Sequence, residues 1–203
     1  SSDLACFEIN AQRIYGFDAE TVGIEAARQA VDSLKAEKIE TGTFPVIFTQ
    51  MAFSSLLYYT VINAVKADYV QRERSAYKDR IGEQVASGVV TVHDDGLLDG
   101  GLLTRKFDGE GVPCQKTLLI YKGVLKNFLF DNYSAKKVGV SSTGNSSRPG
   151  IASYASTPVL EASNFVFAPG NKTGEELVDE VEEGLIVYGV QGAHSVFGKE
   201  TTV

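Results

Sequence analysis

The apolar and polar positions in the first half of the chain predict two helices and two short strands. After Asp18, apolar residues recur at every fourth position as far as residue 34, which is typical of a helix capped by Asp18. Residues 4–15 partly alternate between apolar and polar types, and this predicts a strand. Pro45 opens a further short strand over 45–50, and apolar residues at helical spacing over 53–64 predict the second helix.

The second half is richer in strand signals. A β-branched run at 89–93 predicts a strand that enters a turn at 94–96. Apolar runs at 118–121 and 124–130 flank the dipeptide Lys122-Gly123, as in a β-hairpin. A polar loop that contains glycine follows this hairpin.

Helix and strand signals also alternate near the end of the chain. Residues 164–168 predict a strand, Thr173 and Glu176 form a capping box that starts a helix, Gly184 is suited to end it, and 185–190 predict a last strand. Because strands and helices are mixed but unevenly distributed, the pattern favours an α+β fold: a largely antiparallel β-sheet with flanking helices.

Composition narrows the classes of function. The chain has 203 residues and a net charge of −7, so it lacks the basic surface that binding to nucleic acid requires. Its two cysteines, Cys6 and Cys114, lie far apart and indicate no disulfide framework, which favours a reducing compartment, the cytoplasm. We find no apolar run near the roughly 18 residues of a membrane span and no signal-peptide pattern, so we expect no membrane association.

Four short motifs follow one another between residues 107 and 149. They are the turn EGVP, the hairpin LIYKGVLK, the helix start YSA and the loop STGN. In this order they resemble the TldD/PmbA family, and the resemblance extends over essentially all 203 residues but only the central part of a family chain. The resemblance implies a single domain, residues 1–203, from the C-terminal region of the family. We expect it to be truncated at both ends.

The zinc motif of the family falls on unsuitable residues here. Members of the TldD branch carry an HExxxH motif, in which neutral imidazoles bind the metal and the carboxylate handles the proton of water. Counting back from the segment GEQVAS, which resembles the family pattern G-x-x-V-A-S, the motif positions fall on Tyr58, Tyr59 and Asn63. Phenols and a neutral amide are poor substitutes for the imidazole and carboxylate groups of the motif. The chain therefore resembles the PmbA/TldE branch, whose members lack the motif.

The resemblance also suggests contact residues. In the family, the STGN loop lies close to the peptide-binding groove. Ser142, Thr143, Gly144, Asn145 and Arg148 are therefore candidates for contact with a peptide or a partner subunit. The loop lacks the lysine and the spacing of a phosphate-binding loop, and glycine-rich polar loops of this kind are more often plain turns.

Three further positions could carry chemistry, but each has a structural interpretation that we favour. His93, Asp94 and Asp95 could bind a divalent ion, yet neighbours on a strand point to opposite faces, so we favour a turn in which the carboxylates cap backbone amides. His194 has no acidic or cysteine partner at ligand spacing. Cys114 has no base nearby in the sequence, and a small buried apolar role is the better interpretation.

Three functions stay open. The first is a non-catalytic subunit of a TldD/PmbA-type heteromeric zinc metalloprotease that processes or degrades unfolded peptides. The resemblance implies that zinc is bound only by a motif-bearing TldD-type partner, and that this chain holds no cofactor and no catalytic residue of its own. The second is a stand-alone binding or scaffold protein of the gyrase-modulator type. The third is an independent hydrolase that uses other groups.

Overall fold

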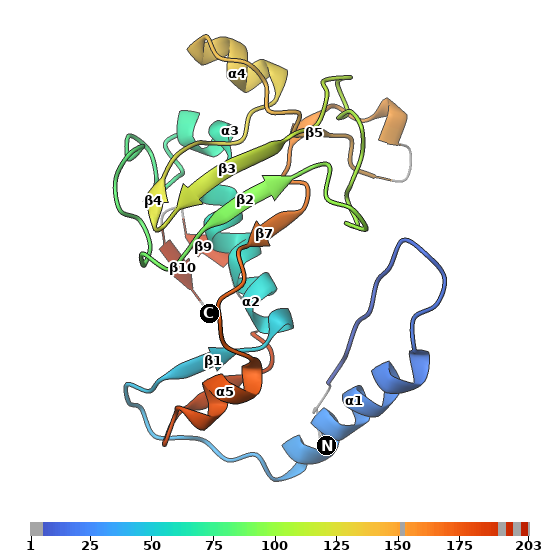
Figure 1. Ribbon diagram of the computed structural model, residues 1–203, viewed down its shortest axis with the longest axis vertical. Coiled ribbons are helices and arrows are strands. Elements are labelled where there is room, and N and C mark those ends of the chain that lie inside the picture. The colour runs from blue at the N-terminus through green and yellow to red at the C-terminus, as the bar shows by residue number, and fades with distance from the viewer. Residues whose placement is uncertain (1–5, 151–152, 191–193, 197–199, 203) are drawn as a thin grey trace. The chain divides into compact units, whose positions relative to one another are not determined.

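The computed structural model describes residues 6–150, 153–190, 194–196 and 200–202 (Figure 1). The chain divides into two compact units, one made of Ser1–Thr43 with Gly100–Leu102 and the other of Phe44–Asp99 with Leu103–Val203. We describe each unit by itself. Within the described residues, no helix is long and apolar enough to cross a bilayer.

The first unit contains the helix α1 (Ala19–Asp32), followed by the short 3-10 helix η1 (Ser33–Lys35). Asp18 caps α1 as the sequence predicts, because its carboxylate accepts hydrogen bonds from the amides of Glu20 and Thr21. The strand expected over 4–15 is wrong for its described part. Residues 6–15 form no strand, and no strand lies among the described residues of this unit to satisfy their backbone groups.

The second unit is built on a four-stranded antiparallel sheet in the order β4-β3-β2-β7 (Figure 1). These strands are β2 (Val92–Asp95), β3 (Lys116–Tyr121), β4 (Val124–Leu125) and β7 (Phe165–Phe167). Val92, Leu119 and Leu125 are fully buried and form the centre of the hydrophobic core. Burial of such side chains is the dominant stabilising contribution to a domain of this size.

The predicted hairpin joins β3 to β4. Lys122 and Gly123 both have positive φ, 47° and 80°, as a two-residue type I′ turn requires. Gly123 is also needed for close packing, because a Cβ at this position would lie 2.3 Å from the carbonyl oxygen of Ala86. Local sequence and tertiary packing therefore agree at this turn.

Three two-stranded pairs are also present in the described part of the chain. The pair β1 (Val46–Phe48) with β8 (Leu185–Val187) is parallel, whereas the other two pairs are antiparallel. The antiparallel pairs are β5 (Ser146–Ser147) with β6 (Val159–Leu160), and β9 (His194–Val196) with β10 (Glu200–Thr202). The predicted α+β class with a largely antiparallel sheet is confirmed.

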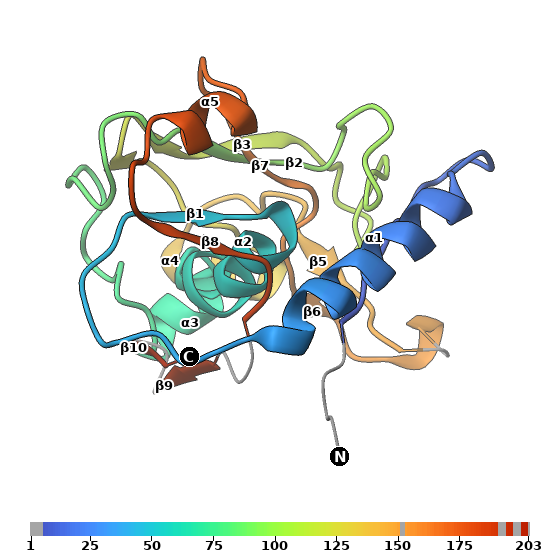
Figure 2. The same ribbon diagram turned by 90° about the horizontal axis from the view of Figure 1, so that it is seen from below.

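Helical segments cover one face of the central sheet. The predicted second helix is present as α2 (Gln50–Leu57), which continues into a π-helical turn, η2 (Tyr58–Ile62). The segment that follows leads to α3 (Ala67–Gln71), which lies on the same side of the sheet as α2 (Figure 2). The buried Val65 and Ala67 belong to the same core cluster as the sheet residues. Further helices are α4 (Asn132–Val138), the 3-10 helix η3 (Ser153–Ala155) and α5 (Gly174–Asp179).

Two local predictions are corrected by tertiary contacts. The capping box of Thr173 and Glu176 is confirmed, but α5 ends at Asp179 rather than near Gly184. Gly184 instead lies against β1, where a Cβ would be 2.8 Å from the carbonyl oxygen of Pro45. The turn expected at 94–96 also starts later, because Asp94 and Asp95 belong to β2 and pair with β3.

Candidate functional site

The three positions that the resemblance assigns to the zinc motif lie on and directly after the π-helical turn. Tyr58 and Tyr59 are the first two residues of η2, and Asn63 follows its last residue. The two tyrosine side chains are exposed, and their rings meet edge to face with centroids 5.1 Å apart. The aromatic pair therefore occupies the surface where the motif would place a histidine and a glutamate.

The π-helical geometry matters for residues five positions apart. In a regular α-helix, residues i and i+5 point about 140° apart. A turn closed by i to i+5 hydrogen bonds returns residue i+5 to nearly the face of residue i, and such turns are frequent at functional sites. Tyr58 and Asn63 are separated by five positions, so this backbone has the geometry that a pair of metal ligands at this spacing would need.

The side chains themselves do not fit zinc. Zinc in proteins is bound by thiolates, neutral imidazoles and carboxylates. Tyr58 and Tyr59 offer phenols and Asn63 offers a carboxamide, and neither group belongs to this set of zinc ligands. Among the described residues, no group of three or more His, Cys, Asp or Glu side chains is arranged to hold a metal ion.

The STGN loop is held to the chain just before α4. Ser142 Oγ and the amide of Thr143 each donate a hydrogen bond of 3.0 Å to the carbonyl oxygen of Phe130, and Thr143 Oγ1 accepts one of 2.7 Å from the amide of Phe130. Gly144 has φ of 73°, and a Cβ there would lie 2.5 Å from the carbonyl oxygen of Pro113. Local bonds and close packing therefore fix the backbone of the loop.

Asn145 is buried, and both polar atoms of its side chain make hydrogen bonds within the protein. Its Nδ2 donates to Asp94 Oδ2 at 2.6 Å and to the carbonyl oxygen of Glu161 at 3.3 Å, and its Oδ1 accepts from Thr143 Oγ1 at 2.6 Å. Arg148 is likewise engaged, with its guanidinium donating to the carbonyl oxygens of Gly109 and Ser156. The structure thus brings the five candidate contact residues together, and it gives Asn145 and Arg148 structural bonds.

The carboxylate of Asp94 is the centre of this network. It also accepts from the amide and the hydroxyl of Ser163, both at 2.7 Å. Burial raises the pKa of Asp94 above its ordinary value, while the hydrogen bonds from Ser163 and Asn145 oppose that shift. The structural interpretation of Asp94 from the sequence agrees with these contacts, except that Asp94 lies in a strand.

The other residues that the sequence offers for chemistry are His93, Cys114 and His194, and they lie in different environments. Burial, helped by Lys116, lowers the pKa of His93. Burial raises the pKa of the Cys114 thiol, whose Sγ contacts the carbonyl oxygen of Gly144 at 3.3 Å, so this cysteine has the environment of a structural residue rather than a nucleophile. His194 lies in β9, and its side chain is outside the described part of the chain.

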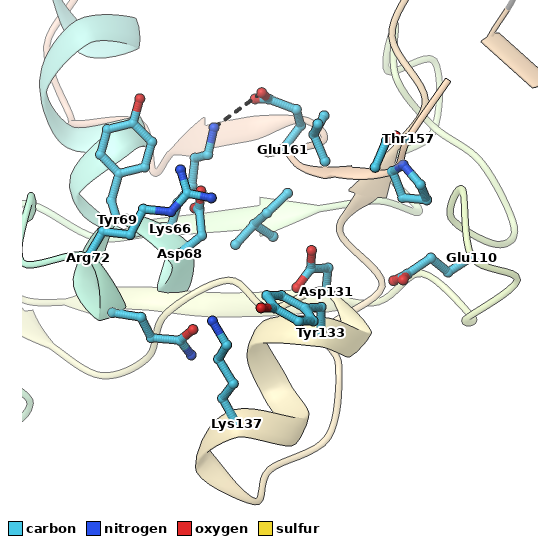
Figure 3. Close-up of a pocket in the computed structure, with 14 residues that line it drawn as sticks. Lys66, Asp68, Tyr69, Arg72, Glu110, Asp131, Tyr133, Lys137, Thr157 and Glu161 are labelled. Carbon is cyan, nitrogen blue, oxygen red and sulfur yellow. Dashed lines mark ion pairs between the residues drawn. The ribbon is translucent and has the colours of Figure 1, made fainter. Parts of the chain in front are cut away.

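Sequence reasoning missed a pocket of about 640 Å³ between α3, α4 and β6 (Figure 3). Lys66 lines it together with residues of all three elements, and its ammonium pairs with Glu161 at 3.1 Å. Lys66 is only 5% exposed. The signal that could have indicated the pocket is a lysine within the apolar run Ala64 to Ala67, because lysine is rarely buried without a specific partner.

The class of domain is defined by an antiparallel sheet that is covered by α2 and its π-helical turn and bonded to the STGN loop. Residues 41–201 match the model of the PmbA/TldA metallopeptidase C-terminal domain, and the chain therefore belongs to the PmbA/TldD family. The match includes the central sheet, the helix with the tyrosine pair and the STGN loop. The resemblance found from the four motifs is confirmed.

Several relatives carry the name metalloprotease. A metalloprotease of Methanocaldococcus jannaschii is 32% identical over 199 residues, which is 95% of this chain and 43% of that protein. The metalloprotease PmbA of Escherichia coli is 29% identical over 173 residues, 85% of this chain and 35% of PmbA. The chain spans about two fifths of the length of two relatives from Methanocaldococcus jannaschii.

Similarity to solved structures supports the same family assignment. The crystal structure of TldE from Thermococcus kodakarensis aligns with a TM-score of 0.82 and 31% identity, covering 92% of this chain and 41% of TldE. A candidate modulator of a DNA gyrase from Thermotoga maritima aligns with a TM-score of 0.75 and 32% identity, covering 87% of this chain and 39% of that protein.

Proposed function

We propose that this chain is part of a non-catalytic subunit of a heteromeric zinc metalloprotease that processes or degrades unfolded peptides. The observation that carries the proposal is the set of side chains at the motif positions. Tyr58, Tyr59 and Asn63 occupy a helical turn with suitable backbone geometry but with donors that do not suit zinc. A motif-bearing partner subunit of the TldD type would supply the metal and the general base, in the cytoplasm.

The similarity to TldE supports this assignment to the branch without the motif, and the metalloprotease names of the relatives support the peptidase context. Neither membrane nor nucleic acid is expected as a partner, given the net charge of −7. The second candidate is a stand-alone binding or scaffold protein without peptidase activity, which the similarity to the Thermotoga maritima protein favours.

Reconstitution with a motif-bearing family member tests the proposal. The full chain, tagged, is co-expressed with that partner, and co-elution, zinc content and cleavage of an unfolded fluorogenic peptide are measured. We expect zinc to follow the partner and cleavage to require both subunits. Replacing the motif glutamate of the partner by glutamine should abolish cleavage, whereas Tyr59→Phe in this chain should leave it unchanged.

The other functions give different results. A stand-alone scaffold would neither co-elute with the partner nor change cleavage. An independent hydrolase would contain one equivalent of zinc on its own and would cleave the peptide in a manner sensitive to a chelator. That last result would overturn the proposal.

A further inference from the structure

The pocket between α3, α4 and β6 contains a buried cation with donors to spare. Lys66 Nζ lies 3.1 Å from Glu161 Oε1 and 5.3 Å from the centre of the Tyr69 ring. An ammonium has three N–H donors, and these contacts leave donors free. Because a buried charge is costly unless it is well paired, the site is suited to a further acceptor.

Two more cations line the same pocket. Arg72 is exposed and makes no side-chain hydrogen bond or ion pair with any described residue. Lys137 Nζ lies 4.2 Å from the centre of the Tyr133 ring, and its side chain makes no ion pair within the described part of the chain. Figure 3 shows Lys66 and Arg72 on one side of the pocket and Lys137 on α4.

Two of the acids around the pocket are already bonded to donors of the protein. Asp131 Oδ1 accepts from the amide of Ser134 at 2.7 Å, and Glu110 Oε2 accepts from the amide of Asn132 at 3.0 Å. The pocket is lined by four carboxylates and three cations, but Lys66 and Arg72 lie on one side of it with free donors, away from Glu110 and Asp131 (Figure 3). That side favours a carboxylate, which lysine and arginine bind through charge-assisted hydrogen bonds.

One acceptor and an apolar wall make the ligand more specific. Asp68, which also lines the pocket, has a buried Oδ1 without a donor among the described residues. Val159 and the buried Leu160 give the pocket an apolar wall. A ligand that carries a carboxylate, an N–H group close to it and an apolar side chain would satisfy all three features.

We propose that this pocket binds the C-terminal carboxylate of a peptide whose last side chain is apolar. The carboxylate is held by Lys66 and Arg72, the last backbone amide donates to Asp68, and the side chain packs on Leu160. The choice of a peptide as ligand rests on the proposed function, whereas the preference for a carboxylate follows from the side chains of the pocket.

Binding of a matched pair of peptides to the full chain tests this site without any partner. Both peptides are acetylated and end in leucine, one with a free carboxylate and the other with a carboxamide. We expect the free acid to bind about tenfold more tightly by fluorescence anisotropy, as the loss of one charge-assisted bond implies. Lys66→Met and Arg72→Gln should remove this preference. Lys126→Met, at an exposed position outside the pocket, should keep it.

The variants distinguish a loss of peptide binding at the pocket from a loss of folding. If circular dichroism shows that Lys66→Met does not fold, Arg72→Gln at its exposed position decides the test. Equal affinity for acid and amide, no binding of either peptide, or an undiminished preference in Arg72→Gln would overturn the proposal. A chain that fails this test but supports cleavage with a partner overturns the pocket alone. A chain that discriminates the peptides but joins no partner overturns the proposed subunit role alone.

Discussion

Asn145 Nδ2 donates a hydrogen bond of 2.6 Å to Asp94 Oδ2, and the two buried residues are 51 positions apart in the sequence. Ser163 donates two further bonds to the same carboxylate. The STGN loop, β2 and the segment after β6 therefore meet at one side chain. The sequence predicts that the STGN loop contacts a peptide or partner, but the structure shows that Asn145 of this loop is hydrogen-bonded to the central sheet.

Asn145→Ala should destabilise the protein. The substitution removes a donor from the buried carboxylate of Asp94 and leaves the carbonyl oxygen of Glu161 without its side-chain partner, which typically costs about 1–3 kcal/mol. Urea unfolding of the variant measures this loss, and Ser141→Ala, at an exposed position of the same loop, should change stability by less than about 0.5 kcal/mol. Unchanged stability of Asn145→Ala together with weaker peptide cleavage would instead favour the contact role expected from the sequence.

Gly144→Ala should be far more damaging than Gly139→Ala, although both glycines have φ of 73°. The left-handed conformation alone costs an L-residue about 1–2 kcal/mol. At Gly144 the new Cβ would also lie 2.5 Å from the carbonyl oxygen of Pro113, whereas at Gly139 it meets no atom within 4 Å. The free energies of unfolding of the two variants give the cost of the close contact, and equal values would show that this contact relaxes freely.

Asp94→Asn should alter the dependence of stability on pH. Burial raises the pKa of Asp94, so the folded state keeps a proton at pH values where the unfolded chain has released it. The free energy of unfolding of the wild type should therefore fall, relative to that of Asp94→Asn, as pH rises from about 4 through the folded-state pKa. Urea unfolding between pH 4 and 7 measures the difference, with Asp99→Asn as an exposed control. The opposite slope would mean that the three hydrogen bonds outweigh burial.

The triple substitution of Tyr58→His, Tyr59→Glu and Asn63→His should create metal binding at η2. The π-helical turn places the two new imidazoles on nearly one face, with the carboxylate beside them. Cobalt absorption and zinc content after dialysis measure the gain, and Tyr58→His alone serves as the control because one imidazole does not retain the ion. A triple variant that binds no more metal than this control would refute the alignment of the motif with residues 58–63.

Part of the fold follows from interactions between residues close in sequence. The cap at Asp18, the capping box of Thr173 with Glu176 and the turn at Lys122-Gly123 were all predicted, because each depends on a few neighbouring residues. The strand expected at 4–15 was wrong in its described part for the complementary reason. Alternation of side chains makes a strand possible, but only a partner strand can satisfy its backbone.

The sequence by itself determined the family, the α+β class and the unsuitable donors at Tyr58, Tyr59 and Asn63, since these depend on residue types and their spacing. Only the tertiary structure decided that Asn145 is an internal bonding residue and that Lys66 lines a pocket with spare donors. Burial and hydrogen bonding are set by segments that lie far apart in the chain and meet only on folding. For that reason the spacing of motifs identified the class of site, whereas the available ligand-binding groups became visible only in three dimensions.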